Sequence, residues 1–152
     1  MVVKTRGQIY RDMATGLREM GTGEAAALAA DALAETILVC HTKKLPREQW
    51  VMFEVARLAT EVETAVVLAR KSARDAGPRK ELLMACARLH GGAAARDVAS
   101  TGLRVLMASG LYDAEEIAAY REAIRFEELL ATSYGEMGLM NQVATALEAD
   151  IA

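Results

Sequence analysis

The sequence has 152 residues, a size typical of one domain, and a net charge of −3 from 18 Lys and Arg against 21 Asp and Glu. Apolar residues make up 53% of the chain but aromatic residues only 5%, and about 30 residues are alanine. This composition, with only two prolines, predicts an all-α protein. The nearly balanced charge argues against a general nucleic-acid binder, and two cysteines are too few for a disulfide framework, so we expect a reducing, cytoplasmic environment.

Two further locations are disfavoured by the sequence. No window of about 18 residues is free of charged side chains, so we expect no membrane-spanning helix. The first residues, through Lys4, are not followed by the apolar run of a secretory signal.

The first two predicted helices cover residues 3–20 and 24–43. In the first, Ile9, Met13 and Leu17 recur at helical spacing, and the glycines of the segment 21–23 end the pattern. The second ends in basic residues followed by proline, as helices commonly do. Its apolar stripe consists of Ala26, Ala30, Leu33, Ile37 and Cys40.

The next two predicted helices, over residues 47–76 and 79–109, are the longest. The apolar stripe of the third helix is Val51, Val55, Leu58, Val62, Ala65 and Ala69, which is typical of a helix that faces a core. The stripe of the fourth is Leu83, Ala87, His90, Ala94, Val98, Thr101 and Val105. Gly91 and Gly92 lie inside this fourth helix, where small residues would let a neighbouring helix approach closely.

The C-terminal part contains a predicted helix to about residue 134 and a last amphipathic stretch. Asp113 stands three residues before Glu116, the spacing of a capping box. Short turns between long helices indicate antiparallel neighbours, so we predict an up-down-up-down four-helix bundle over residues 24–134. Amphipathic segments at 1–23 and 135–152 would flank it, and in the second of these Met137 and Met140 are candidates for either an interface or the core.

Cysteine and histidine were considered as metal ligands. Cys86 and His90 lie four residues apart on one helical face, and Cys40 with His41 might add ligands from another helix. The long third helix separates the turns beside these two pairs, and neither histidine belongs to a Glu-x-x-His motif. We therefore predict no metal site, and interpret the residues as buried cysteine and core histidine.

Carboxylate pairs and basic clusters were the other candidates for chemistry. Glu61 with Glu63, or Glu115 with Glu116, could form an acid–base pair, but their spacing is also that of a solvated helix face. Basic residues surround two turns and could bind acidic lipid or a CoA phosphate, but we favour the interpretation that they complement the helix dipoles at helix ends. The two clusters are His41, Lys43, Lys44 and Arg47, and Lys71, Arg74, Arg79 and Lys80.

A series of short motifs lies between Ala29 and about Leu106. They are Glu35-x-x-x-x-x-His41-x-Lys43-Lys44, Glu48-Gln49, Leu58-Ala59, Val66-Val67-Leu68-x-Arg70-x-Ser72, Cys86 and Ala93-Ala94-Ala95-Arg96. With these motifs the region resembles the extra C-terminal helical domain of the very-long-chain type of acyl-CoA dehydrogenases and its bacterial relatives.

This resemblance implies a role in packing. Members of the family are flavoproteins that oxidise acyl-CoA with FAD and a catalytic glutamate, both held by a core that 152 residues cannot contain. The family's Tyr-Glu-Gly-Thr motif has only Tyr134-Gly135-Glu136-Met137 as its nearest match, so no catalytic role passes to Glu136. In relatives the extra domain packs against the core, supports dimerisation and in some lies near a membrane surface.

The expected function is therefore an accessory helical domain, a fragment or a stand-alone chain, with no catalytic residue and no cofactor of its own. The expected partner is an acyl-CoA dehydrogenase core or a second copy, with no nucleic acid and at most weak peripheral membrane contact. A different class of function is an independent helical-bundle adaptor that self-associates through residues 3–20 and 137–151. A small enzyme using Cys86 or His90 is a third hypothesis.

Overall fold

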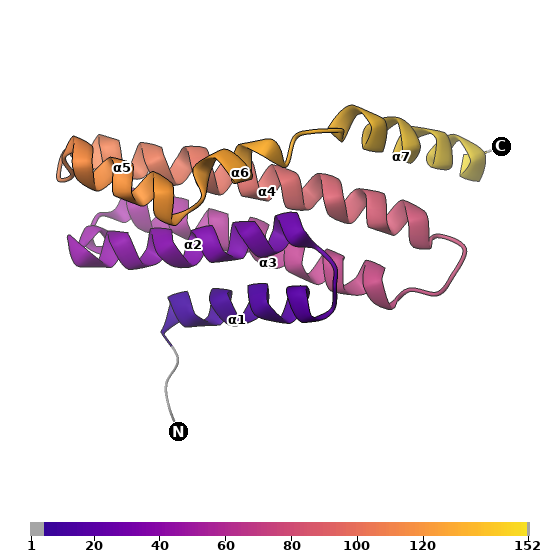
Figure 1. Ribbon diagram of the computed structural model, residues 1–152, viewed down its shortest axis with the longest axis horizontal. Helices are drawn as coiled ribbons and strands as arrows, with labels where there is room; N and C mark the ends of the chain where they lie inside the picture. Colours follow the sequence, from indigo (N-terminus) through magenta and orange to yellow (C-terminus); the bar gives the residue numbers. More distant parts are fainter. Residues whose placement is uncertain (1–4, 152) are drawn as a thin grey trace, which may run out of the picture.

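The computed structural model describes residues 5–151, and this part of the chain is entirely helical apart from turns (Figure 1). The all-α class predicted from the composition is confirmed. The first two positions of the helix predicted over 3–20 lie outside the described residues. The elements are α1 (Arg6–Glu19), α2 (Glu24–Thr42), η1 (Leu45–Arg47), α3 (Gln49–Arg74), α4 (Lys80–Ser109), α5 (Ala114–Ala123), α6 (Phe126–Ala131) and α7 (Glu136–Ile151).

Helix α2 is the centre of the fold and packs against α1, α3 and α4 (Figure 1). By length and composition alone α2 could cross a membrane, but 61% of its most apolar 18-residue window is buried inside the protein. The two acidic residues in its middle, Asp31 and Glu35, form ion pairs with Arg18 and Arg11 of α1. Packing among three helices therefore accounts for the apolar composition of α2.

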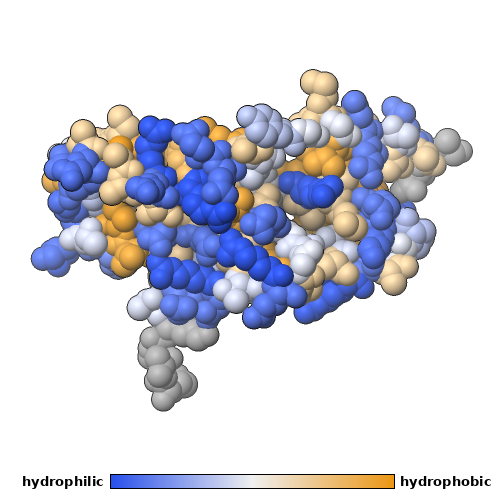
Figure 2. Space-filling model, in the orientation of Figure 1, coloured by the Kyte–Doolittle hydropathy of each residue, from blue (hydrophilic) through white to orange (hydrophobic). Residues whose placement is uncertain are grey.

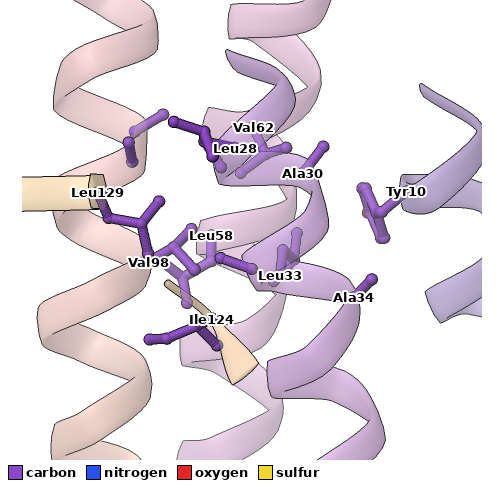
Figure 3. Packing of buried hydrophobic residues seen from close by; sticks show 14 of the residues in the cluster. Tyr10, Leu28, Ala30, Leu33, Ala34, Leu58, Val62, Val98, Ile124 and Leu129 are labelled. Atoms are coloured by element: carbon purple, nitrogen blue, oxygen red, sulfur yellow. The ribbon is translucent and has the colours of Figure 1, made fainter. Parts of the chain in front are cut away.

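One continuous hydrophobic core joins α1 through α6 (Figure 3). Leu33, Leu58 and Val98 meet at its centre from α2, α3 and α4. Helix α1 contributes Tyr10 and Leu17, so it packs as part of this core. Every residue of the stripe predicted for α2 is buried. In the stripe predicted for α3, Val55 is half-buried and all the other residues are buried.

The small residues of α4 allow two close approaches. A Cβ atom on Gly91 would lie 3.1 Å from the backbone nitrogen of Ala26, so the glycine lets α2 lie directly against α4. A Cβ on Gly102 would lie 2.0 Å from the hydroxyl of Tyr120, which occupies the notch left by the missing side chain. The Tyr120 hydroxyl lies 2.8 Å from Thr36 Oγ1, and Thr36 in turn donates to the carbonyl of Ala32. Tyr120 is thus the donor to Thr36. Both buried hydroxyls therefore have hydrogen-bond partners where α2, α4 and α5 meet.

The helix predicted to continue to about residue 134 is instead broken into α5 and α6, which is a correction. Arg125 adopts φ 57°, in the left-handed region, which ends α5 after Ile124. The break lets Ile124 and Leu129 both reach the core, where each is 2% exposed or less. A straight helix would not direct both side chains to the same side, since residues five apart are about 140° apart around the axis.

Candidate functional site

A largely apolar groove lies between α1, α2 and the first half of α3. Its volume is about 650 Å³. Tyr10 stands on the α1 side, Ile37 and Leu38 on α2, and Val51 and Met52 on α3. The remaining lining residues are Thr5, Gly7, Cys40, His41, Pro46, Val55, Ala56 and Ala59. Such a hollow with a largely aliphatic wall is suited to an apolar ligand or to the side chains of a partner helix.

Two large apolar residues of the groove wall are open to solvent. Leu38 and Met52 line the groove, and 53% and 55% of their surface is exposed. Large apolar side chains exposed at a cavity mark an interaction surface more often than a solvated face. We call Leu38 and Met52 the groove rim.

The polar groups at the groove include a buried thiol, an exposed imidazole and a hydroxyl that joins two helices. Burial raises the pKa of the Cys40 thiol to about 11, so the reactive thiolate is disfavoured near neutral pH. His41 beside it is exposed. The Tyr10 hydroxyl donates to Glu63 Oε1 at 2.8 Å, which ties α1 to α3.

The structure does not bring the two Cys–His pairs together. Cys40 and His41 line the α1–α2–α3 groove, whereas Cys86 is half-buried in the first half of α4. Among the described residues no three His, Cys, Asp or Glu side chains are grouped as metal ligands. His90 Nε2 lies 3.8 Å from Glu61 Oε2, and this buried nitrogen has no hydrogen-bond partner.

The proposed carboxylate pairs have separate structural uses. Glu61 faces His90 on α4, whereas Glu63 accepts the bond from Tyr10. Glu116 closes the predicted capping box: its backbone N–H donates to Asp113, and its side chain accepts from the Asp113 N–H. The hydrogen bond from Lys43 lowers the pKa of the Glu116 carboxyl below its ordinary value.

The basic residues of the two clusters have different surroundings in the structure. Lys43 lies 2.8 Å from Glu116 and stacks over the ring of Tyr112, whose hydroxyl donates to the Val39 carbonyl. Lys43 thus fastens the end of α2 to the start of α5, and is not part of an open anion site. Lys44 and Arg47 remain exposed at the turn. At the other end Lys71 and Arg74 line a shallow depression of about 480 Å³ together with Val67, Arg70 and Asp75.

An ion-pair network between α3 and α4 was not predicted from the sequence. The Arg57 guanidinium donates to Glu54, to Asp97 and to the hydroxyl of Thr101, and Arg104 donates to Glu54. The bond from Arg57 lowers the pKa of the Asp97 carboxyl. Glu54 and Arg57 are three apart on α3, which is a recognisable signal, but their partners on α4 follow only from the packing.

Helix α7 presents a second apolar surface. Met137 and Met140 are 77% and 54% exposed, so the core alternative for these residues is wrong. Figure 2 shows hydrophobic residues reaching the surface in the region where α7 lies over α4. Glu136, in the partial match to the dehydrogenase motif, accepts from Arg96 Nη2 at 2.9 Å and anchors the start of α7 on α4.

In comparisons with known proteins, no family model, no curated protein and no solved structure matches the chain.

Proposed function

We propose that this chain is a non-catalytic helical interaction domain, and that it serves as an accessory domain of an acyl-CoA dehydrogenase family flavoprotein. The observation that carries the proposal is the α1–α2–α3 groove with its exposed rim. An amphipathic helix of a partner could place its apolar side chains into this groove and cover Leu38 and Met52. The residues quoted above for the resemblance support the dehydrogenase core as that partner.

The local chemistry supports packing as the mechanism. The one cysteine in the groove has a raised pKa, Glu63 accepts the hydrogen bond from Tyr10, and Glu116 is held by Lys43 and the capping box. FAD in this proposal belongs to the dehydrogenase core, and the chain contributes no group to it. We place the complex in the cytoplasm.

The fold proposed for this role is an up-down-up-down four-helix bundle over residues 24–134, made by α2, α3, α4 and the α5–α6 pair. The alternation of chain direction visible in Figure 1 and the shared core support it. Segments 1–23 and 135–152 flank this unit in the proposal.

A second candidate function is an independent adaptor that self-associates through its terminal helices. The exposure of Met137 and Met140 on α7 favours it. The terminal helices of this candidate are α1 and α7. Because α7 contributes no residue to the groove lining, its part in self-association can be tested separately from docking at the groove rim.

The first candidate is tested by two measurements. Purified chain should show no flavin absorbance and no oxidation of acyl-CoA with a dye acceptor; bound FAD with turnover would contradict a non-catalytic role. Calorimetric titration should then detect binding to an acyl-CoA dehydrogenase core that lacks its own extra domain.

The variant Met52→Glu should weaken this binding at least tenfold, because it places a charge in an apolar contact. The matched control is Met107→Glu, at an exposed methionine of α4 away from the groove lining, and it should bind like the unmodified chain. Equal loss in both variants, or no binding by the unmodified chain, would refute the groove as the docking site.

A further inference from the structure

The outer face of α7 has the pattern of a helix–helix seam. Met137, Met140, Ala144 and Leu147 follow one another at steps of three, four and three residues, and all four are exposed. This is the spacing of the a and d positions in a coiled coil, where each apolar side chain packs between residues of a partner helix. The seam extends over about 15 Å at 1.5 Å per residue, or roughly three turns.

The same stretch of α7 carries no charge. Residues 137–147 contain no Asp, Glu, Lys or Arg, and the glutamate just before them, Glu136, is turned inward to Arg96. A solvated helix face normally has charged residues at such positions, whereas the centre of a protein interface is depleted of them.

The inner face of α7 is already occupied. Helix α7 packs against α4, and its residues Leu139 and Val143 are half-buried while the seam residues remain exposed. The seam is therefore a second apolar face beside the first, and it stays open while α7 is docked on α4.

We propose that this face binds α7 of a second copy, in antiparallel orientation, so that the chain forms a closed dimer. The proposal names the partner for the self-association described as the second candidate function and rests on it. Because the seam carries no charges, two copies can meet there without like-charge repulsion. A partner helix that bears charges would not need an uncharged surface opposite it.

The exposed area is sufficient for a dimer. Leu147 is 49% and Tyr134, at the turn before α7, is 87% exposed, in addition to the two methionines. At on the order of 200 Å² for each large side chain, these exposed fractions amount to roughly 530 Å² per copy and about 1,100 Å² for the pair, which exceeds the roughly 1,000 Å² expected of a biological interface.

Side-chain size selects the antiparallel orientation. With two antiparallel helices centred between Met140 and Ala144, each Met140 faces the small Ala144 of the other copy, and Met137 faces Leu147. A parallel pair would place alanine opposite alanine and leave a gap.

Crosslinking between single-cysteine positions tests the orientation. Met140→Cys and Ala144→Cys are made separately in a Cys86→Ser background, while the buried Cys40 is kept. After mild oxidation, an equimolar mixture should give mostly a 140–144 crosslink, identified by peptide mass. Crosslinks only within each variant would indicate parallel helices and overturn the proposal, as would the absence of any crosslink.

The mass of the chain in solution tests the dimer. Sedimentation equilibrium should give twice the chain mass for the unmodified protein and the single-chain mass for Met140→Glu and for Leu147→Glu, with circular dichroism showing unchanged helix content. Met107→Glu, an equally drastic change at an exposed methionine on α4, should remain dimeric. A monomeric unmodified chain, or assemblies larger than two, would refute a closed α7 pair.

The outcome is separable from the docking of a dehydrogenase core. Met140→Glu should bind that core as the unmodified chain does, since the variant leaves the α1–α2–α3 groove intact. Loss of the dimer with core binding retained supports the α7 pair alone. Loss of core binding in Met140→Glu would contradict the assignment of two separate surfaces.

Discussion

At the scale of single residues, glycine decides how closely the helices of this protein approach. Gly102 is the clearest case, because the hydroxyl of Tyr120 fills the space that a side chain would need. Burial raises the pKa of Tyr120, and its hydroxyl is held neutral in a bond to Thr36. The notch, the tyrosine and the threonine form one unit, contributed by three helices.

The variant Gly102→Ala should lower the free energy of unfolding by about 2–3 kcal/mol, since the new methyl group overlaps Tyr120 and must displace it. Urea denaturation followed by circular dichroism measures this. The control Gly138→Ala, where a Cβ meets nothing within 4 Å, should be neutral or stabilising by about 0.5–1 kcal/mol.

If the overlap with Tyr120 is the cause, the double variant Gly102→Ala with Tyr120→Phe should lose less stability than the two single variants combined. Simple additivity in this cycle would show that the notch is not what makes Gly102 necessary.

At the scale of secondary-structure elements, boundaries are set by local chemistry where a cap is available and by packing where it is not. Helix α5 begins with the capping box that its sequence predicts. It ends at Arg125, a residue with no intrinsic preference for a left-handed conformation, because Ile124 and Leu129 both require burial. The end of α5 was therefore not predictable from local pattern.

Loss of the cap should destabilise the protein measurably. Asp113→Ala removes the acceptor of the Glu116 N–H and should reduce the free energy of unfolding by about 1 kcal/mol. Glu122→Ala, at an exposed carboxylate in the last turn of the same helix, should change it by less than about 0.5 kcal/mol. Equal effects would mean that general charge, and not the cap, stabilises α5.

At the scale of the whole molecule, carboxylates that bridge helices make stability depend on pH. The hydrogen bond from Arg57 lowers the pKa of Asp97. The pKa of Glu54 is lowered as well, chiefly by its hydrogen bond from Arg104. A carboxyl whose pKa is lower in the folded than in the unfolded state contributes stability above its unfolded pKa. That contribution is lost as the pH falls through the folded value.

We therefore expect the melting temperature to fall as the pH decreases below about 4, the ordinary range of Asp. Asp97→Asn should melt about 2–4 °C lower than the unmodified chain at pH 7, a modest effect because solvent screens this half-exposed group. The difference should shrink at pH 3. Glu81→Gln, at an exposed carboxylate on the same helix, should show no such pH-dependent difference, and a constant difference for Asp97→Asn would contradict the ion-pair explanation.

The sequence by itself determined the helical class, the positions of the long helices and which face of each is buried. These follow from apolar spacing, caps and turn residues, all of which act within a few positions along the chain. Accordingly the stripe from Ala26 to Cys40 is buried and the capping box at Asp113 is present.

Only the tertiary structure decided how far a helix continues and which apolar residues stay uncovered. The break at Arg125, the groove beneath Leu38 and Met52, and the exposed seam of α7 depend on which helix meets which, and no local pattern contains that information. Met137 illustrates the reason: helical spacing shows that a side chain belongs to an apolar face, whereas burial requires a second element to cover that face.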